Sequence, residues 1–194
     1  MWYNYLYFWY LQEVEINIFY IDHDPVQAAI WMVDKHVVKM ILESAQLLST
    51  AHRIHDGVET MGKTPTGRNV KRWTLPDARE TVLYSATHNN HPSAIWCRKS
   101  VENYNWLTDH MFALLAEYTY RYDKIHKVQG ELSYMLQSPP NNLREYDRTP
   151  MLSAMANEYK ISDDSLINYR NYYKKGKTHL FNWKKRQPPE WIYE

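Results

Sequence analysis

The sequence predicts a mostly α-helical protein: a compact single-domain helical bundle with one short N-terminal strand. Apolar residues recur with the period of a helix over 24–55, 92–127 and 163–185, whereas residues 16–21 alternate as a strand does. The length of 194 residues fits one domain, and the contents of 44% hydrophobic and 23% charged residues are close to globular averages. We therefore expect residues 16–194 to share one buried core.

The first fifteen residues form an aromatic N-terminal extension. Its opening, MWYNYLYFWY, holds seven aromatic residues and none of the basic residues that begin a secretory signal. Gln12 and Glu13 end this run well short of the roughly 20 apolar residues that a membrane span needs. We interpret residues 1–15 as translated upstream sequence, with the native start near Ile16. A β-strand and a partner-binding arm are the alternatives.

The first helix is predicted to begin at Asp24, as N-cap, with Pro25 in the first turn. It carries two stripes on opposite sides. The apolar stripe consists of Val37, Val38, Ile41, Leu42, Ala45 and Leu48, and the polar stripe consists of His36, Lys39, Glu43, Gln46 and Thr50. A solvated helix face is the commoner explanation of such a polar stripe, and we favour it. The sharper alternative is a catalytic carboxylate flanked by groups that bind a phosphate or a sugar.

Residues 56–80 and 138–150 are predicted to be loops, because Gly, Pro and charged residues occur there without a period. A loop as long as 56–80 is either functional or mobile. The helix that follows Pro92 is expected to bury one stripe of side chains, which holds Trp96, Leu107, Leu114 and Tyr118.

Composition excludes several classes of protein. A net charge of +1 excludes attraction to nucleic acid by bulk charge, and the single cysteine, Cys97, excludes a disulfide framework and a thiolate zinc cluster. Only 5 glycines are present and no glycine-rich phosphate loop motif occurs. We expect a cytoplasmic protein of a bacterial or phage-infected host cell, with no cofactor and no contact with a membrane.

Residues 168–186 combine basic and aromatic side chains, with seven Lys and Arg residues and no Asp or Glu. Basic groups neutralise phosphates and aromatic rings stack on unpaired bases, so the pattern favours contact with nucleic acid. A helix with an aromatic face in the core and a basic face exposed to solvent would give the same pattern. The candidate nucleic-acid-binding residues are Arg170, Tyr172, Tyr173, Lys174, Lys175, Lys177, Trp183, Lys184, Lys185 and Arg186, with His88 and His91 of the HNNHP segment.

Three groups of residues resemble the pyrimidine-dimer DNA glycosylase/AP lyase family, the endonuclease V type of phages and bacteria. Asp34, His36 and Glu43 reproduce its Asp-x-His pattern with a Glu seven residues beyond the His. The HNNHP segment before Trp96 is similar to the family's Asn-His-Pro segment, and the basic aromatic region is similar to its DNA-facing region. These pieces are scattered over about half of the chain.

The resemblance implies a small, mostly helical enzyme that acts on damaged DNA, UV dimers among its candidate substrates. In the family an N-terminal α-amine, whose pKa of about 8 leaves a useful fraction unprotonated, attacks C1′ and forms a Schiff base. By this resemblance Glu43 is the catalytic carboxylate that assists glycosidic cleavage and β-elimination, and His36 contacts DNA nearby. If Met1 is the genuine start, Lys39 would have to supply the amine.

Two other hypotheses stay open beside this DNA glycosylase/lyase. One is a non-catalytic nucleic-acid-binding viral protein that uses residues 168–186. The other is a metal-dependent nucleotide hydrolase, whose ligands would come from His23, Asp24, His52, His88 and His91. We favour no metal site, because His91 before Pro92 is a better helix cap than a ligand and His110 lies on a core stripe.

Overall fold

The computed structural model describes residues 16–64 and 66–194. Its helices are α2 (Pro25–Trp31), α3 (Asp34–Asp56), α4 (Arg79–Val82), α5 (Pro92–Cys97), α6 (Val101–Tyr122), α7 (Glu131–Met135) and α8 (Ser165–Gly176), with short 3₁₀ turns η1 (Asn157–Tyr159), η2 (Thr178–Leu180) and η3 (Glu190–Ile192). In the described residues the only sheet is an antiparallel pair of strands, β1 (Val58–Lys63) and β2 (Asn69–Thr74). The prediction of a mostly α fold is confirmed.

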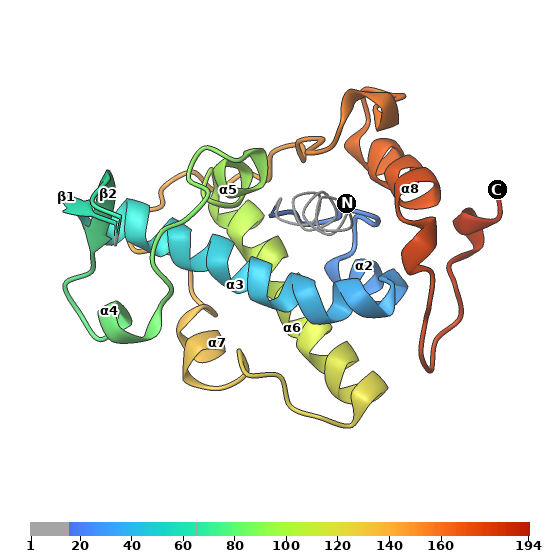
Figure 1. Ribbon diagram of the computed structural model, residues 1–194, viewed down its shortest axis with the longest axis horizontal. Coiled ribbons are helices and arrows are strands. Elements are labelled where there is room, and N and C mark those ends of the chain that lie inside the picture. The colour runs from blue at the N-terminus through green and yellow to red at the C-terminus, as the bar shows by residue number, and fades with distance from the viewer. Residues whose placement is uncertain (1–15, 65) are drawn as a thin grey trace, which may run out of the picture.

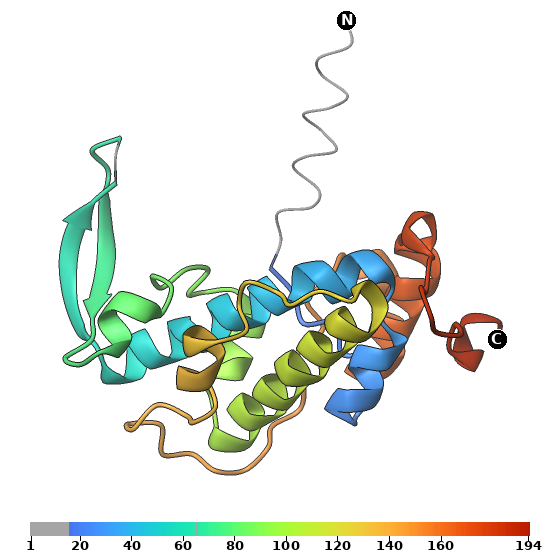
Figure 2. The same ribbon diagram turned by 90° about the horizontal axis from the view of Figure 1, so that it is seen from below.

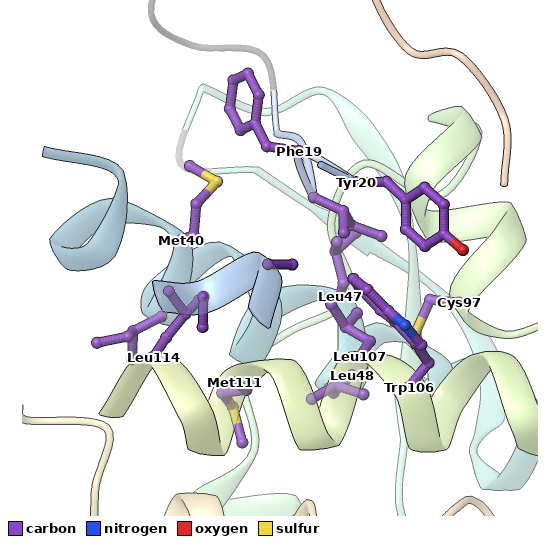
Figure 3. Close-up of a cluster of buried hydrophobic side chains, with 14 of the residues drawn as sticks. Phe19, Tyr20, Met40, Leu47, Leu48, Cys97, Trp106, Leu107, Met111 and Leu114 are labelled. Carbon is purple, nitrogen blue, oxygen red and sulfur yellow. The ribbon is translucent and has the colours of Figure 1, made fainter. Parts of the chain in front are cut away.

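The core forms where α3 crosses α6 (Figure 1). Leu47 and Leu48 of α3 meet Leu107 and Met111 of α6, and all four side chains are fully buried (Figure 3). The predicted apolar stripe of α3 is buried except at Leu42, which is half-buried, and at Val38, which is 39% exposed. The stripe predicted for the helix after Pro92 also faces the core.

Two of the predicted long helices are interrupted. Asp24 does cap α2 by accepting from the Val26 and Gln27 amides, but Met32 and Val33 are extended and separate α2 from α3. The helix predicted over 92–127 stops after α5 and restarts at α6, where the Ser100 side chain accepts from the Asn103 amide. A side-chain cap inside an apolar pattern therefore marks a helix start that the period does not show.

The predicted N-terminal strand is wrong. Residues 16–21 are buried, but they form no regular secondary structure and pair with no described strand. Their amides bond to side chains instead: the Asn17 amide donates to Glu43, and the Ile18 amide donates to the Asn17 side chain. Phe19 has a left-handed backbone, with φ of 54°, which a strand does not tolerate.

The predicted loop at 56–80 is also wrong in part, because it contains the β1–β2 hairpin and α4. The strands pair from Val58 opposite Thr74 to Lys63 opposite Asn69. Gly67 has φ of 83° and its amide donates to the Thr64 carbonyl oxygen, which supplies the turn. Residues 138–150, by contrast, are irregular as predicted.

The helix predicted over 163–185 ends at Gly176. A side chain at this position would begin 2.7 Å from the Tyr172 ring, so the close approach requires glycine. The chain beyond contains only the short turns η2 and η3. Lys184, Lys185 and Arg186 are therefore not on a helix.

A buried ion-pair network joins the start of α3 to α6 and to the C-terminal segment. Arg121, fully buried on α6, donates to Asp34 Oδ1 at 2.9 Å and to Glu117 Oε2 at 2.9 Å. Asp34 also accepts from the Asn182 side chain at 2.6 Å and from the Lys184 amide. The Asp of the Asp-x-His pattern thus anchors the fold.

Replacing Arg121 by Met should lower the free energy of unfolding by about 3–5 kcal/mol, because Asp34 would remain buried without its cation and Glu117 would keep only Arg186. Chemical denaturation measures this loss. Lys124→Met, which changes an exposed lysine two residues beyond the helix, is the matched control and should cost less than about 0.5 kcal/mol. Equal stability of the two variants would contradict a structural role for this network.

Candidate active site

The polar stripe of α3 is not a solvated face, and the interpretation that we favoured from the sequence is wrong. His36, Glu43 and Thr50 are only 4%, 7% and 0% exposed. Residues 16–21 cover the first part of the stripe, and both views place this blue segment beside α3 (Figures 1 and 2). The alternative interpretation, a functional carboxylate with polar neighbours, fits this burial better.

Glu43 lies between a backbone amide and a lysine. Its Oε2 accepts from the Asn17 amide at 2.9 Å, and its Oε1 lies 3.2 Å from Lys39 Nζ. The side chain of Glu43 is 9% exposed, whereas that of Lys39 is 40% exposed. The carboxylate is therefore held behind a lysine that reaches solvent.

Burial raises the pKa of Glu43, and the opposing effects of Lys39 and the Asn17 amide do not cancel it. A carboxylate with a raised pKa is a stronger base than an ordinary glutamate. Glu43 can therefore accept a proton from a neighbouring amine more readily than an exposed carboxylate could.

Asn17 holds the covering segment in place. Its side-chain oxygen accepts from Tyr169 OH at 3.0 Å and from the Ile18 amide at 2.8 Å, and its Nδ2 donates to the Ala154 carbonyl oxygen at 2.8 Å. The next residue but one, Phe19, keeps the left-handed backbone noted above. Such strain in a bulky residue persists where surrounding contacts fix it, often near functional sites.

His36 is held in its neutral form. Its Nδ1 lies 2.7 Å from Tyr173 OH, which accepts from the Val33 amide and can donate its own proton to the imidazole. The Phe19 ring stacks on His36 at 4.2 Å between centroids. Burial lowers the pKa of His36 well below its usual value, and the positive charges of Lys177 and Lys39 lower it further.

The surroundings of the carboxylate are cationic. Lys39 and Lys177 act on His36 from α3 and from just beyond the end of α8, and His179 adds to them. Lys177 Nζ also lies 5.0 Å from the Tyr172 ring centroid and 5.7 Å from that of Phe19. A buried carboxylate among cations suits a phosphate-bearing substrate, because the cations attract its negative charge.

Most aromatic residues predicted to contact nucleic acid point inward. Tyr173 is fully buried, Tyr172 packs on Phe19 and Tyr159, and Trp183 donates from Nε1 to the Trp31 carbonyl oxygen. These contacts give the aromatic rings a packing role in the structure, which is the alternative that the sequence left open.

The basic residues of the same segment differ in their surroundings. Arg170 pairs with Asp22 and packs between two tryptophan rings, Lys185 pairs with Asp123 at 2.9 Å, and Arg186 pairs with Glu117. Lys184 lies over the Tyr122 ring. Lys174 is half-buried and Lys175 is exposed in the last turn of α8, just before Lys177. Contact of these residues with DNA stays a prediction.

The histidines that could have formed a metal site have separate partners. His91 caps α5, as predicted, by accepting from the Ser93 amide, and His110 is buried in the core as predicted. His52 bonds to Tyr104 OH at 2.8 Å and to Arg79 at 2.9 Å, while His23 bonds to Tyr20 OH. His88 is exposed and bonds to Thr87, and Asp24 caps α2. In residues 16–64 and 66–194, no three His, Cys, Asp or Glu side chains are grouped to hold a metal ion.

Sequence reasoning missed Asn17, Phe19 and Tyr169 as parts of this site. The segment INIFYID was predicted to be a strand, so no functional role was predicted for Asn17 within it. An asparagine within an otherwise apolar run is the signal that could have identified it, because a buried amide must find partners.

Comparison with known proteins adds no relative: no protein-family model, no curated protein and no solved structure matches the chain. None of the helices in the described residues combines the length and the apolar character of a membrane span.

Acidification should destabilise the protein between pH 6.5 and pH 4, because His52 and His110 have pKa values lowered to about 4 by burial. The unfolded chain binds more protons than the folded protein in this window, so the free energy of unfolding rises as the pH rises. The stabilisation that these two histidines contribute is complete above pH about 6.5. His52→Gln should reduce this slope by up to about 1.4 kcal/mol per pH unit, as measured by denaturation at a series of pH values.

His88→Gln is the control, since His88 is exposed. This variant should leave the slope as it is in the unaltered protein. A slope unchanged by His52→Gln would show that His52 is not held neutral by its surroundings.

Proposed function

We propose that the protein is a DNA glycosylase/AP lyase that acts on damaged DNA through an amine placed beside Glu43. The observation that carries the proposal is the 2.9 Å contact between the Asn17 backbone nitrogen and Glu43 Oε2, next to the Lys39 ion pair. Two nitrogens thus approach one buried carboxylate of raised pKa. The resemblance to the pyrimidine-dimer glycosylase family, on Asp34, His36 and Glu43, supports the same chemistry.

The reaction proceeds through an imine. The unprotonated amine attacks C1′ while the bond from C1′ to the damaged base breaks, and the base takes up a proton from water. The attached amine loses one proton to Glu43, which passes it to O4′ as the C1′–O4′ bond breaks. This step gives a protonated Schiff base and returns Glu43 to its carboxylate form. Glu43 then removes a proton from C2′, the C3′–O bond breaks, and water releases the amine.

Two amines can fill this role. Lys39 Nζ is 3.2 Å from Glu43 Oε1 and its side chain is partly exposed, so a nucleotide can reach it. In a chain that begins near Ile16, the α-amine would lie at or next to the Asn17 nitrogen, beside Glu43 Oε2. The second arrangement follows the family more closely.

A flipped nucleotide suits this site better than a stacked one. Glu43 lies below the molecular surface, so a sugar must leave the duplex to reach it. Lys39 and Lys177 both act on the Glu43 carboxylate, so they would attract the flanking phosphates of a nucleotide held there.

Borohydride reduction should trap a covalent adduct between the protein and an abasic or UV-irradiated duplex, since it reduces the imine to a stable amine. Glu43→Gln should lower the rate of adduct formation by about 10²–10⁴-fold, the usual contribution of a general base. Gel electrophoresis of the reduced mixture measures the rate.

Glu102→Gln, an exposed carboxylate on α6, is the matched control and should trap at the rate of the unaltered protein. Lys39→Gln and a form beginning at Ile16 then distinguish the two amines. Absence of an adduct from all these proteins, on both substrates, would contradict the lyase mechanism.

A further inference from the structure

The β1–β2 hairpin projects from the helical body at the C-terminal end of α3 (Figure 2). Most of its side chains are exposed on both faces of the two-stranded ribbon. Its base is fixed by Arg53, which donates to the Trp73 carbonyl oxygen at 2.9 Å. An isolated two-stranded hairpin is marginally stable and contributes little to a core, so its extension into solvent calls for another role.

The hairpin is basic. It carries Lys63, Arg68, Lys71 and Arg72 against one acid, Glu59. Lys71 pairs with Glu59 at 2.8 Å, whereas the other three cations are exposed and form no ion pair with any described residue. The stem of Arg72 lies over Gly62, where a Cβ would come within 2.9 Å of it.

The hairpin and the candidate active site lie at a definite spacing along α3. Glu43 and Asp56 are thirteen residues apart, which at 1.5 Å per residue corresponds to about 20 Å. This length equals about six base pairs of B-form DNA. The hairpin projects to the side of the helical body on which the blue segment 16–24 begins (Figure 2).

We propose that the β1–β2 hairpin is a DNA-binding arm, which contacts the phosphates and a groove of the duplex on one side of the nucleotide held at Glu43. A two-stranded ribbon fits the major groove, and three uncompensated cations match the charge of the backbone. The proposal rests on the proposed function for its choice of duplex DNA as the partner. It adds a second contact, about six base pairs from the reacting sugar, that the helices do not supply.

The test compares two triple variants of equal charge change. Lys63→Gln, Arg68→Gln and Arg72→Gln alter the hairpin and keep part of each aliphatic stem; Lys99→Gln, Lys124→Gln and Lys127→Gln alter exposed lysines elsewhere. Fluorescence anisotropy measures affinity for an abasic duplex at several salt concentrations. The hairpin variant should bind about tenfold more weakly at 0.15 M salt, and the magnitude of its log–log salt slope should fall by about 2.7.

Shortening the duplex locates the contact. The unaltered protein should lose affinity when one flank is cut to three base pairs and keep it when the other flank is cut. The hairpin variant should bind both shortened duplexes equally. Affinity and salt slope equal to those of the lysine control would overturn the proposal, as would failure of the unaltered protein to bind duplex DNA.

Trapping on a short single-stranded abasic oligonucleotide separates this inference from the proposed lyase. The hairpin variant should form the adduct at the unaltered rate there, because the arm has no duplex to contact. If the unaltered protein forms no adduct but its duplex affinity depends on the hairpin, the lyase fails and the binding arm stands.

Discussion

The contact between residues 16–21 and the polar stripe of α3 determines how this structure is organised. Residues 16–21 cover part of this stripe: the Asn17 amide donates to Glu43, and the Phe19 ring stacks on His36. Burial then raises the pKa of the carboxylate and lowers that of the imidazole. One short segment thereby changes an ordinary amphipathic helix into a helix with two buried faces.

The rest of the fold keeps this segment in position. Helix α8 supplies Tyr169, which donates to Asn17, and Tyr173, which bonds to His36. The start of α3 is held in turn by the pair of Asp34 with Arg121 on α6. Three separate parts of the chain therefore hold the carboxylate and its neighbours, an arrangement that favours chemistry requiring fixed geometry.

The Asp24-Pro25 pair predicted the cap of α2. Periodicity predicted the helical class and the core faces of α3 and α6, because these depend on local pattern. It could not predict which polar residues are buried, since Glu43 is covered by a segment 26 residues away in the sequence. The hairpin was not predicted because most of its side chains are exposed, and exposed strands lack the alternation that marks a half-buried strand. The end of α8 at Gly176 was not predicted, although glycine commonly marks the end of a helix.

Identification of the residue bonded to DNA tests the central claim most directly. The borohydride-reduced adduct would be digested and the modified peptide sequenced by mass spectrometry. Our account predicts that the nucleotide remnant is attached to Lys39 or, in a chain that begins near Ile16, to the α-amine beside Glu43. Attachment to a lysine remote from Glu43, such as exposed Lys71 of the β1–β2 hairpin, would contradict the account.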